Sequence, residues 1–199
     1  MRRFVILGRT AKASAQFSLD DLPSTSGRLD VLLRCVRAAL LTSHGLRPEV
    51  LIYLALQGGP ETPRVIRIGG AGLQFVRPDE RSLALLVQKA LGRHAAGAPR
   101  FIQQKPGLSV AEGGLERVLE DLGPARAYVL EEGAADIRGA SLEGDDLAFF
   151  IGDHLGFDEA TRAALARIGA EPISVGPLSL HSDDVVSLVS NELDRRSSQ

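Results

Sequence analysis

Short apolar runs alternate with amphipathic segments along the whole 199-residue chain, and this alternation restricts the possible folds more than any other feature. Residues 51–56 are apolar at every position, which is typical of a strand buried on both faces. Residues 29–40 instead place apolar side chains three or four positions apart, which is typical of a helix. The pattern therefore predicts an α/β fold with a largely parallel sheet covered by helices on both faces.

Turn residues divide the rest of the chain into further expected elements. Strands are expected at residues 3–8, 50–56, 65–68, 127–130, 147–151 and 172–175. Helices are expected at residues 28–43, 83–91, 115–122, 158–169 and 185–193. Residues 9–27 lack periodicity and are expected to form a long loop. Because no repeat and no long linker interrupts this order, residues 1–199 are expected to form a single domain.

Several classes of protein are disfavoured by what the sequence lacks. No apolar run approaches the roughly 20 residues of a membrane span, and the N-terminal run stops at Gly8, so a cytoplasmic protein is expected. The single cysteine, Cys35, excludes an internal disulfide framework and is expected to be a small buried hydrophobe. The histidines are scattered and the motifs of dinucleotide, phosphate-loop and hydrolase sites are missing, so no metal is expected.

The two halves of the chain carry opposite charge. Residues 1–100 contain 15 lysines and arginines against 7 acidic residues, and residues 101–199 contain 8 against 18. Most of the N-terminal cations are arginines, whose planar guanidinium groups bind phosphate well. The N-terminal half is therefore expected to face a polyanion, although an arginine-rich genome and a solvated face would give the same composition.

Three expected strand ends in the C-terminal half carry the chemical signal. Leu130 leads into an acidic pair, Ile151 into Gly152, and Val175 into the turn at Gly176. In an open α/β sheet, ligands bind beyond the carboxyl ends of the strands. These three ends could form one small-molecule pocket, or they could be ordinary strand–loop–helix connections, with Ser182 capping the last helix.

Several separate motifs follow one another along the chain: Phe17-Ser18-Leu19-Asp20-Asp21-Leu22-Pro23, Gly27-Arg28-Leu29-Asp30, Pro106-Gly107 with Glu112-Gly113-Gly114-Leu115, Ile151-Gly152-Asp153-His154-Leu155-Gly156-Phe157 and Val175-Gly176-Pro177-Leu178-Ser179-Leu180-His181. In this order they resemble the motifs of the tRNA pseudouridine(54) N1-methyltransferases of the SPOUT superfamily of knotted methyltransferases. The resemblance covers nearly the whole chain. It implies methyl transfer from S-adenosylmethionine (SAM) to N1 of pseudouridine in the T-loop of tRNA.

The resemblance also implies a deep trefoil knot near the C-terminus, a homodimer built around it, and a SAM site formed by the knot loops. The implied SAM-binding residues are Leu130, Gly152, Val175, Gly176, Pro177, Leu178, Ser179, Leu180 and Val185. Val185 stands where the family often has a cysteine, but valine can still offer its backbone and an apolar side chain. The tRNA would bind through the basic N-terminal half.

Methylation at N1 of pseudouridine requires that the nitrogen lose its proton, so the site needs a proton acceptor or a residue that positions one. Asp30 is the first candidate, and Arg28 would hold substrate; an aspartate in a first helical turn can also simply offset the helix dipole. Asp153 and His154 are alternatives for the acceptor, and Arg9 for the substrate contact. A ribosomal RNA substrate and a non-catalytic binding protein both remain open.

Overall fold

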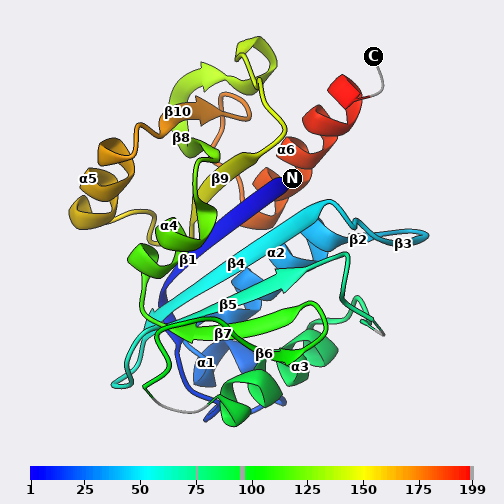
Figure 1. The fold of residues 1–199 in the computed structure, drawn as a ribbon, viewed down its shortest axis with the longest axis vertical. Helices are drawn as coiled ribbons and strands as arrows, with labels where there is room; N and C mark the ends of the chain where they lie inside the picture. Colours follow the sequence, from blue (N-terminus) through cyan, green and yellow to red (C-terminus); the bar gives the residue numbers. More distant parts are fainter. Residues whose placement is uncertain (75, 95–96, 198–199) are drawn as a thin grey trace.

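The computed structural model describes residues 1–74, 76–94 and 97–197, and its main feature is an eight-stranded sheet (Figure 1). The strands follow the order β10-β8-β9-β1-β4-β5-β7-β6 across this sheet. Their bounds are β1 Arg2–Lys12, β4 Val50–Gly58, β5 Arg64–Gly69, β6 Ile102–Lys105, β7 Leu108–Glu112, β8 Arg126–Asp136, β9 Leu147–Gly152 and β10 Glu171–Ser174. A separate hairpin pairs β2 (Leu41–Thr42) with β3 (Gly45–Leu46).

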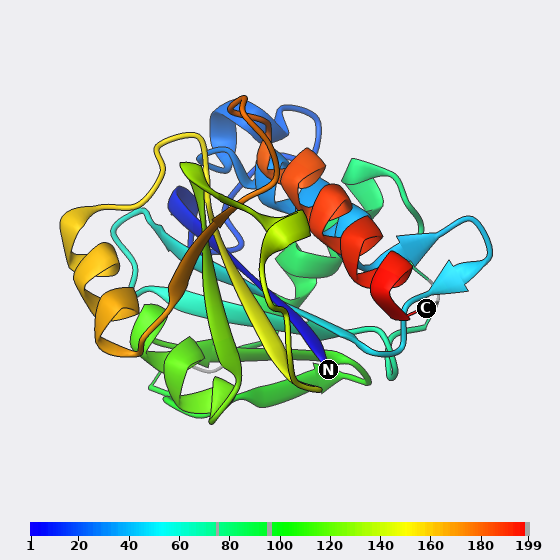
Figure 2. The same cartoon turned by 90° about the horizontal axis from the view of Figure 1, so that it is seen from above.

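Helices cover both faces of the sheet, as expected (Figure 2). One face carries α1 (Leu22–Thr25), α2 (Leu29–Leu40), α3 (Glu80–Arg93) and α6 (Ser182–Ser197). The other face carries α4 (Leu115–Leu122) and α5 (Glu159–Arg167), and a short 3-10 turn, η1 (Ile137–Gly139), follows β8. The C-terminal helix α6 lies beside α2, so segments far apart in the chain pack together on one face of the sheet (Figure 2).

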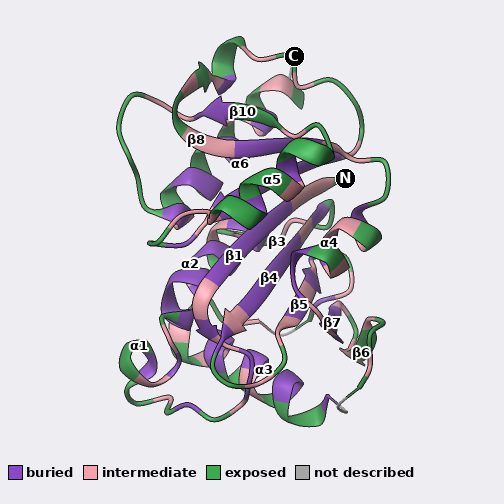
Figure 3. Cartoon of the chain, turned by 90° about the vertical axis from the view of Figure 1, so that its left-hand side faces the viewer, coloured by how far each residue is buried: buried purple, intermediate pink, exposed green. Residues whose placement is uncertain are grey.

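The central strands are buried because both of their faces are covered (Figure 3). In β1, Phe4 and Ile6 point into the core beneath α2 and α6, while Val5 and Leu7 point into the core beneath α4 and α5. Successive side chains of a strand point to opposite faces, so a strand between two helical layers must be apolar at every position. The apolar run at residues 51–56 is explained in the same way, since β4 pairs with β1 on one side and β5 on the other.

The sheet is parallel in one half and antiparallel in the other. Strands β10, β8, β9, β1 and β4 run parallel, whereas β5, β7 and β6 are joined by antiparallel pairs. The sequence did not predict β6 and β7, which form a hairpin through Pro106 and Gly107. Two glutamines in β6 interrupt the apolar signal, because β6 is the edge strand and exposes its side chains.

The expected loop at residues 9–27 is also partly ordered into regular structure. Strand β1 continues to Lys12, which pairs with Gly58, and α1 occupies residues 22–25. The side chain of Ser26 accepts a hydrogen bond from Leu29 N at 3.1 Å, as expected for a residue that starts α2. Cys35 is fully buried on α2, and burial raises the pKa of its thiol. It therefore serves the core as a small hydrophobe, as predicted.

Strand β8 departs from regular pairing where the sequence predicted its end. Val129 pairs with Pro172 of β10, but the next residue of β10, Ile173, pairs with Ala135. Residues 130–134 therefore do not pair with β10 and form a five-residue bulge, in which Gly133 has a φ of +79°. Bulges of this kind re-aim side chains, and here the bulge places three residues at the mouth of a cavity.

Helix α6 is tied to the start of the sheet by one carboxylate. Asp194 accepts two hydrogen bonds from Arg47, at 2.8 and 2.7 Å, and pairs with Arg2 of β1. Burial raises the pKa of Asp194, but the hydrogen bonds from Arg47 and Arg2 outweigh it and hold the pKa below its usual value. The charged form of Asp194 therefore stabilises the docked helix.

We expect Asp194→Asn to lower the free energy of unfolding by about 1 kcal/mol at pH 7, a modest value because the carboxylate is partly solvated. A carboxylate whose pKa is lowered by folding stabilises the protein above its unfolded pKa, about 3.9, and loses this effect as the pH falls further. Urea unfolding of both proteins at pH 7 and pH 3 measures this. A difference in stability that stays the same at both pH values would contradict the assignment.

Within the described part of the chain, no helix is both long and apolar enough to cross a bilayer.

Candidate active site

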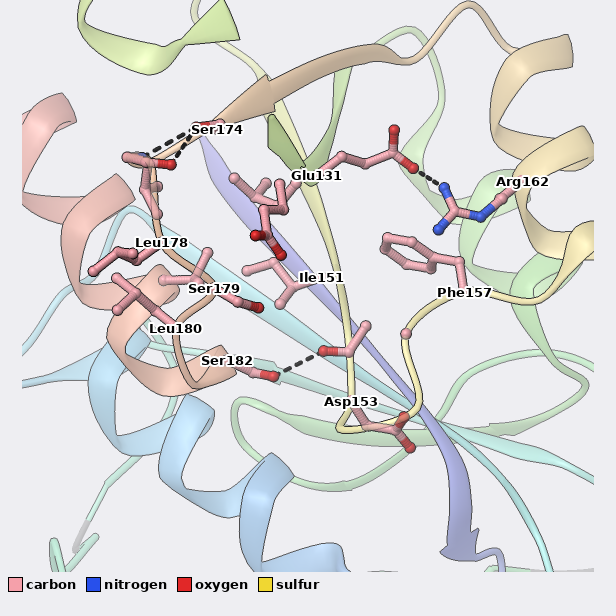
Figure 4. Close-up of a pocket in the computed structure, with 17 residues that line it drawn as sticks. Glu131, Ile151, Asp153, Phe157, Arg162, Ser174, Leu178, Ser179, Leu180 and Ser182 are labelled. Atoms are coloured by element: carbon pink, nitrogen blue, oxygen red, sulfur yellow. Dashed lines mark hydrogen bonds and ion pairs between the residues drawn. The ribbon is translucent and has the colours of Figure 1, made fainter. Parts of the chain in front are cut away.

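A cavity of about 440 Å³ opens at the bulge in β8 and at the carboxyl ends of β9 and β10 (Figure 4). Its walls come from the β8 bulge (residues 130–132), the end of β9 (151–153), the following loop (156–157) and α5. The wall is completed by residues 174–176 and 178–180, between β10 and α6, and by the first turn of α6. The three segments singled out in the sequence therefore meet at one cavity. The expected strand end at Leu130 is wrong, because β8 continues beyond its bulge to Asp136. Carboxyl ends of parallel strands are the usual ligand site of an open α/β sheet.

Gly152 allows the floor of this cavity to close. A Cβ atom at position 152 would lie 2.8 Å from the Cα of Gly156 and 3.0 Å from its carbonyl carbon. No side chain fits at that distance from a backbone, so the loop 152–156 can fold back on β9 only because residue 152 is glycine. Gly156 itself has a φ of +65°, which completes the turn.

Two side chains fix the backbone around Gly152. Asp153 is buried and accepts hydrogen bonds from Arg9 N at 2.8 Å and Leu155 N at 2.9 Å. Ser182 donates from Oγ to the carbonyl oxygen of Gly152 at 2.8 Å. The expectation that Ser182 caps α6 is therefore wrong: α6 begins at Ser182 itself, and its hydroxyl ties that helix to β9.

The cavity has one apolar and one charged side (Figure 4). Leu178 and Leu180 lie on the apolar side, with side chains 72% and 42% exposed. On the opposite side Arg162 of α5 pairs with Glu131 of the bulge, and Phe157 lies beside this pair. The cavity therefore offers an apolar surface and a charged rim to one ligand.

A second charged cluster surrounds Asp30 at the start of α2. Its carboxylate is 3% exposed and accepts two hydrogen bonds from Arg28, at 3.0 and 3.1 Å, and one from Arg34 at 3.2 Å. Burial raises the pKa of Asp30, but the hydrogen bonds and charges of the two arginines outweigh it and hold the pKa below its usual value. Asp30 is thus a charged acceptor with both oxygens occupied, which suits a positioning role better than proton abstraction.

Arg28 adopts a backbone conformation that nonglycine residues avoid, with a φ of +68°. It follows Gly27, where an added Cβ would lie 1.9 Å from the carbonyl oxygen of Thr10. Thr10 donates from Oγ1 back to the Gly27 carbonyl at 2.9 Å, so this loop is clamped onto β1. Strain in a clamped loop is typical of functional positions.

The cavity and the charged cluster around Asp30 are connected through neighbouring residues. Arg34 bridges Asp30 to Glu80 of α3 at 3.0 Å, and its Nε lies 4.0 Å from Asp183, the residue after Ser182. On the other side, the backbone N–H of Arg9 is held by Asp153 at the cavity wall. The clamped loop that carries Arg28 therefore lies beside the cavity, between β1 and α6.

The structure brings nearly all predicted SAM-binding residues to the cavity. Those that line it are Leu130, Gly152, Val175, Gly176, Leu178, Ser179, Leu180 and Val185. Pro177 lies in the same loop but is not among the lining residues. Arg28 and Asp30 form the neighbouring cluster instead.

The sequence interpretation missed further lining residues, among them Glu132, Phe157 and Arg162. The acidic pair after Leu130 was a usable signal, because it lies at a predicted strand end. Arg162 lies inside a helix and carried no signal.

The two alternative proton acceptors differ in their surroundings. Asp153 is buried and its carboxylate already accepts two backbone hydrogen bonds, so it shapes the loop. His154 is exposed and does not line the cavity. Among the residues described, no group of three or more histidine, cysteine or acidic side chains could hold a metal ion.

Comparison with known proteins gives consistent matches over the full length. Residues 1–198 match the family model described as "Putative SAM-dependent RNA methyltransferase". The chain is 44% identical to the tRNA (pseudouridine(54)-N(1))-methyltransferase of Methanosarcina acetivorans, over 98% of this chain and 92% of the relative. It is 38% identical to the enzyme of the same name from Halobacterium salinarum, over 98% of this chain and 96% of the relative.

The fold is also shared with a solved structure that contains S-adenosylhomocysteine. The crystal structure of Archaeoglobus fulgidus Nep1 bound to S-adenosylhomocysteine superposes with a TM-score of 0.69 at 17% identity, covering 100% of this chain and 99% of that one. This likeness concerns the α/β fold, whereas the sequence matches concern the family. Together, the full-length matches show that the chain belongs to the tRNA (pseudouridine(54)-N1)-methyltransferase family of SAM-dependent RNA methyltransferases.

Proposed function

We propose that this protein methylates N1 of pseudouridine at position 54 in the T-loop of tRNA, with SAM as methyl donor. The observation that carries the proposal is the cavity between the β8 bulge and the ends of β9 and β10, with the strained Arg28 and the buried Asp30 beside it, in a member of this family. An activated methyl donor and a substrate base must meet at one place. The cavity and the neighbouring arginine cluster supply two adjoining binding surfaces.

The cavity residues fit SAM. The volume of the cavity, about 440 Å³, is in the range of small-molecule sites. The apolar side could contact the adenine ring, and Glu131 and Glu132 place negative charge near a ligand that carries a sulfonium and an ammonium group. SAM supplies a methyl group bonded to a positively charged sulfur. We propose that the residues that hold it are Leu130, Gly152, Val175, Gly176, Pro177, Leu178, Ser179, Leu180 and Val185.

The neighbouring cluster would act on the base. N1 of pseudouridine is an imide-like N–H, and negative charge spreads to the ring carbonyl oxygens as its proton leaves. Arg28, fixed by two hydrogen bonds to Asp30, can offer its remaining N–H groups to such an oxygen. Asp30 would then position the guanidinium and stay ionised, while Arg28 stabilises the anion and eases loss of the proton to water.

Several finer features accompany this proposal. We propose that residues 1–199 act as one domain, that the segment from β10 to α6 is threaded as a deep trefoil knot, and that two copies form a homodimer in the cytoplasm. The exposed side chains of Leu178, Leu180 and Leu188 support an interface near this segment. The basic N-terminal half would bind tRNA, mainly through phosphate contacts.

The test uses labelled SAM and two tRNA pools, one with and one without pseudouridine in the T-loop. We expect methyl incorporation only into the pool with pseudouridine, and tRNA affinity that falls steeply as salt rises. No incorporation into either pool, with SAM binding intact, would replace the proposed substrate with a ribosomal RNA. Failure to bind SAM in calorimetry would overturn the enzymatic proposal itself.

A further inference from the structure

A second groove, of about 480 Å³, lies at the other edge of the sheet, along α3 and the β6–β7 hairpin. The sheet order places β10 at one edge, near the SAM cavity, and β6 at the other, near this groove (Figure 1). We call it the α3 groove. Helix α3 contributes one of its faces, since the contributing residues follow one another at helical spacing: Ser82, Leu85, Leu86, Lys89, Ala90 and Arg93.

The α3 groove is lined by cations and by no carboxylate. Lys89 and Arg93 come from α3, Arg77 from the segment before it, and Lys105 from the end of β6. Arg77, Lys89 and Arg93 are exposed and Lys105 is half-buried. The surface is thus strongly positive and open to solvent, although the whole chain has a net charge of −2.

The cations of the α3 groove differ from most arginines of the chain because they have no acidic partner among the described residues. Most arginines form ion pairs, including Arg81 on α3 itself, which pairs with Asp20. Within the described ranges, none of the four cations of the α3 groove forms one. The acidic residue that precedes α3, Asp79, accepts a hydrogen bond from Ser82 N and caps the helix near Arg77. The second acidic residue at the start of α3, Glu80, pairs with Arg34.

The dimensions suit an extended polyanion better than a single phosphate. Positions 82 to 93 of α3 extend over roughly 16 Å at 1.5 Å per residue. Leu85, which is 37% exposed, and Leu86 provide apolar surface between the cations, against which a ribose or a base can pack. The start of α3 is joined to the Asp30 cluster through the Arg34–Glu80 pair, at 3.0 Å. A strand lying in the α3 groove can therefore continue toward the proposed reaction site.

We propose that the α3 groove binds the ribose–phosphate backbone of the substrate tRNA outside the reacting T-loop. The proposal rests on the proposed function and adds a second contact region to it. Because this region lies away from the SAM cavity, it should govern tRNA affinity without affecting SAM affinity. It should also contribute more with a whole tRNA than with a short hairpin that contains only the T-loop and its stem.

The test is the double variant Lys89→Gln and Arg93→Gln, made in the full chain. Filter binding should show affinity for whole tRNA reduced roughly tenfold at low salt, and the slope of log affinity against log salt reduced by about two, since two phosphate contacts are lost. In turnover the change should fall on KM rather than kcat. Calorimetry should show SAM affinity equal to that of the wild type.

The matched control is Arg167→Gln with Arg195→Gln, two exposed helical arginines that lie outside the α3 groove and form no ion pair among the described residues. We expect this control to bind tRNA like the wild type. Equal losses in both variants, or an unchanged salt slope in K89Q/R93Q, would overturn the proposal. An acidic membrane surface is the other polyanion that such a groove could bind. The proposal would therefore also be overturned if K89Q/R93Q lost binding to phosphatidylserine vesicles and kept its binding to tRNA. Binding is measured without turnover, so its outcome is separate from whether tRNA is methylated.

Discussion

Replacing Asp30 with asparagine is expected to reduce kcat on the order of 100-fold while SAM binds with unchanged affinity. Asparagine keeps the shape but removes the charge that fixes Arg28 and Arg34, and its amide can accept through one oxygen only. Arg28 then loses the bidentate contact that orients its guanidinium group. Single-turnover methylation of tRNA and calorimetry with SAM separate the two effects.

If Asp30 positions Arg28, two further results are expected. The wild-type rate should show no ionisation of Asp30 between about pH 5 and 8, because its neighbours hold the pKa below the usual value, near 3.9. Arg28→Lys should lose activity as well, because an ammonium group cannot make the paired contact. Asp20→Asn breaks a solvent-exposed aspartate–arginine pair and should be silent. A fully active Asp30→Asn protein would remove this cluster from the mechanism.

Replacing Gly152 with alanine is expected to weaken the affinity for SAM by a factor of 100 or more, equivalent to about 3 kcal/mol. The new methyl group would lie 2.8 Å from the Cα of Gly156, so either β9 or the 153–156 loop must move. Both line the cavity, and Ser182 is bonded to the carbonyl oxygen of Gly152, so the start of α6 would move as well. Calorimetry with SAM measures the loss.

The matched control for this variant is Gly139→Ala. Gly139 lies in η1, and a Cβ added there would meet no atom within 4 Å. It should bind SAM like the wild type. Circular dichroism of Gly152→Ala should show whether the protein remains folded, since the new methyl group would press on the backbone of Gly156. A folded Gly152→Ala protein with normal SAM affinity would show that the cavity tolerates a wider loop and would contradict the assigned site.

Features that depend on neighbouring residues in the chain were predictable. The apolar run at residues 51–56 indicated a strand covered on both faces, and β4 is such a strand. Leu130, Ile151 and Val175 indicated three segments at a common ligand site, and all three reach one cavity, although β8 bulges at Leu130 and ends only at Asp136. The resemblance to the methyltransferase family was carried by short motifs, and the full-length matches confirm it. Periodicity and turn chemistry are local properties, so they can be read directly from a sequence.

Features that depend on distant residues were decided only by the tertiary structure. The sequence shows an aspartate in a first helical turn, but only the fold buries Asp30, which raises its pKa, and places Arg28 and Arg34 against its carboxylate, which outweighs burial and lowers the pKa. The β8 bulge exists because β10 pairs on both sides of residues 130–134, and no local pattern specifies that register. The α3 groove is likewise basic because neighbouring acids are paired elsewhere. Burial, register and ion pairing arise from contacts between segments far apart in the chain, so the sequence determined the elements and the family, and packing determined the chemistry of the site.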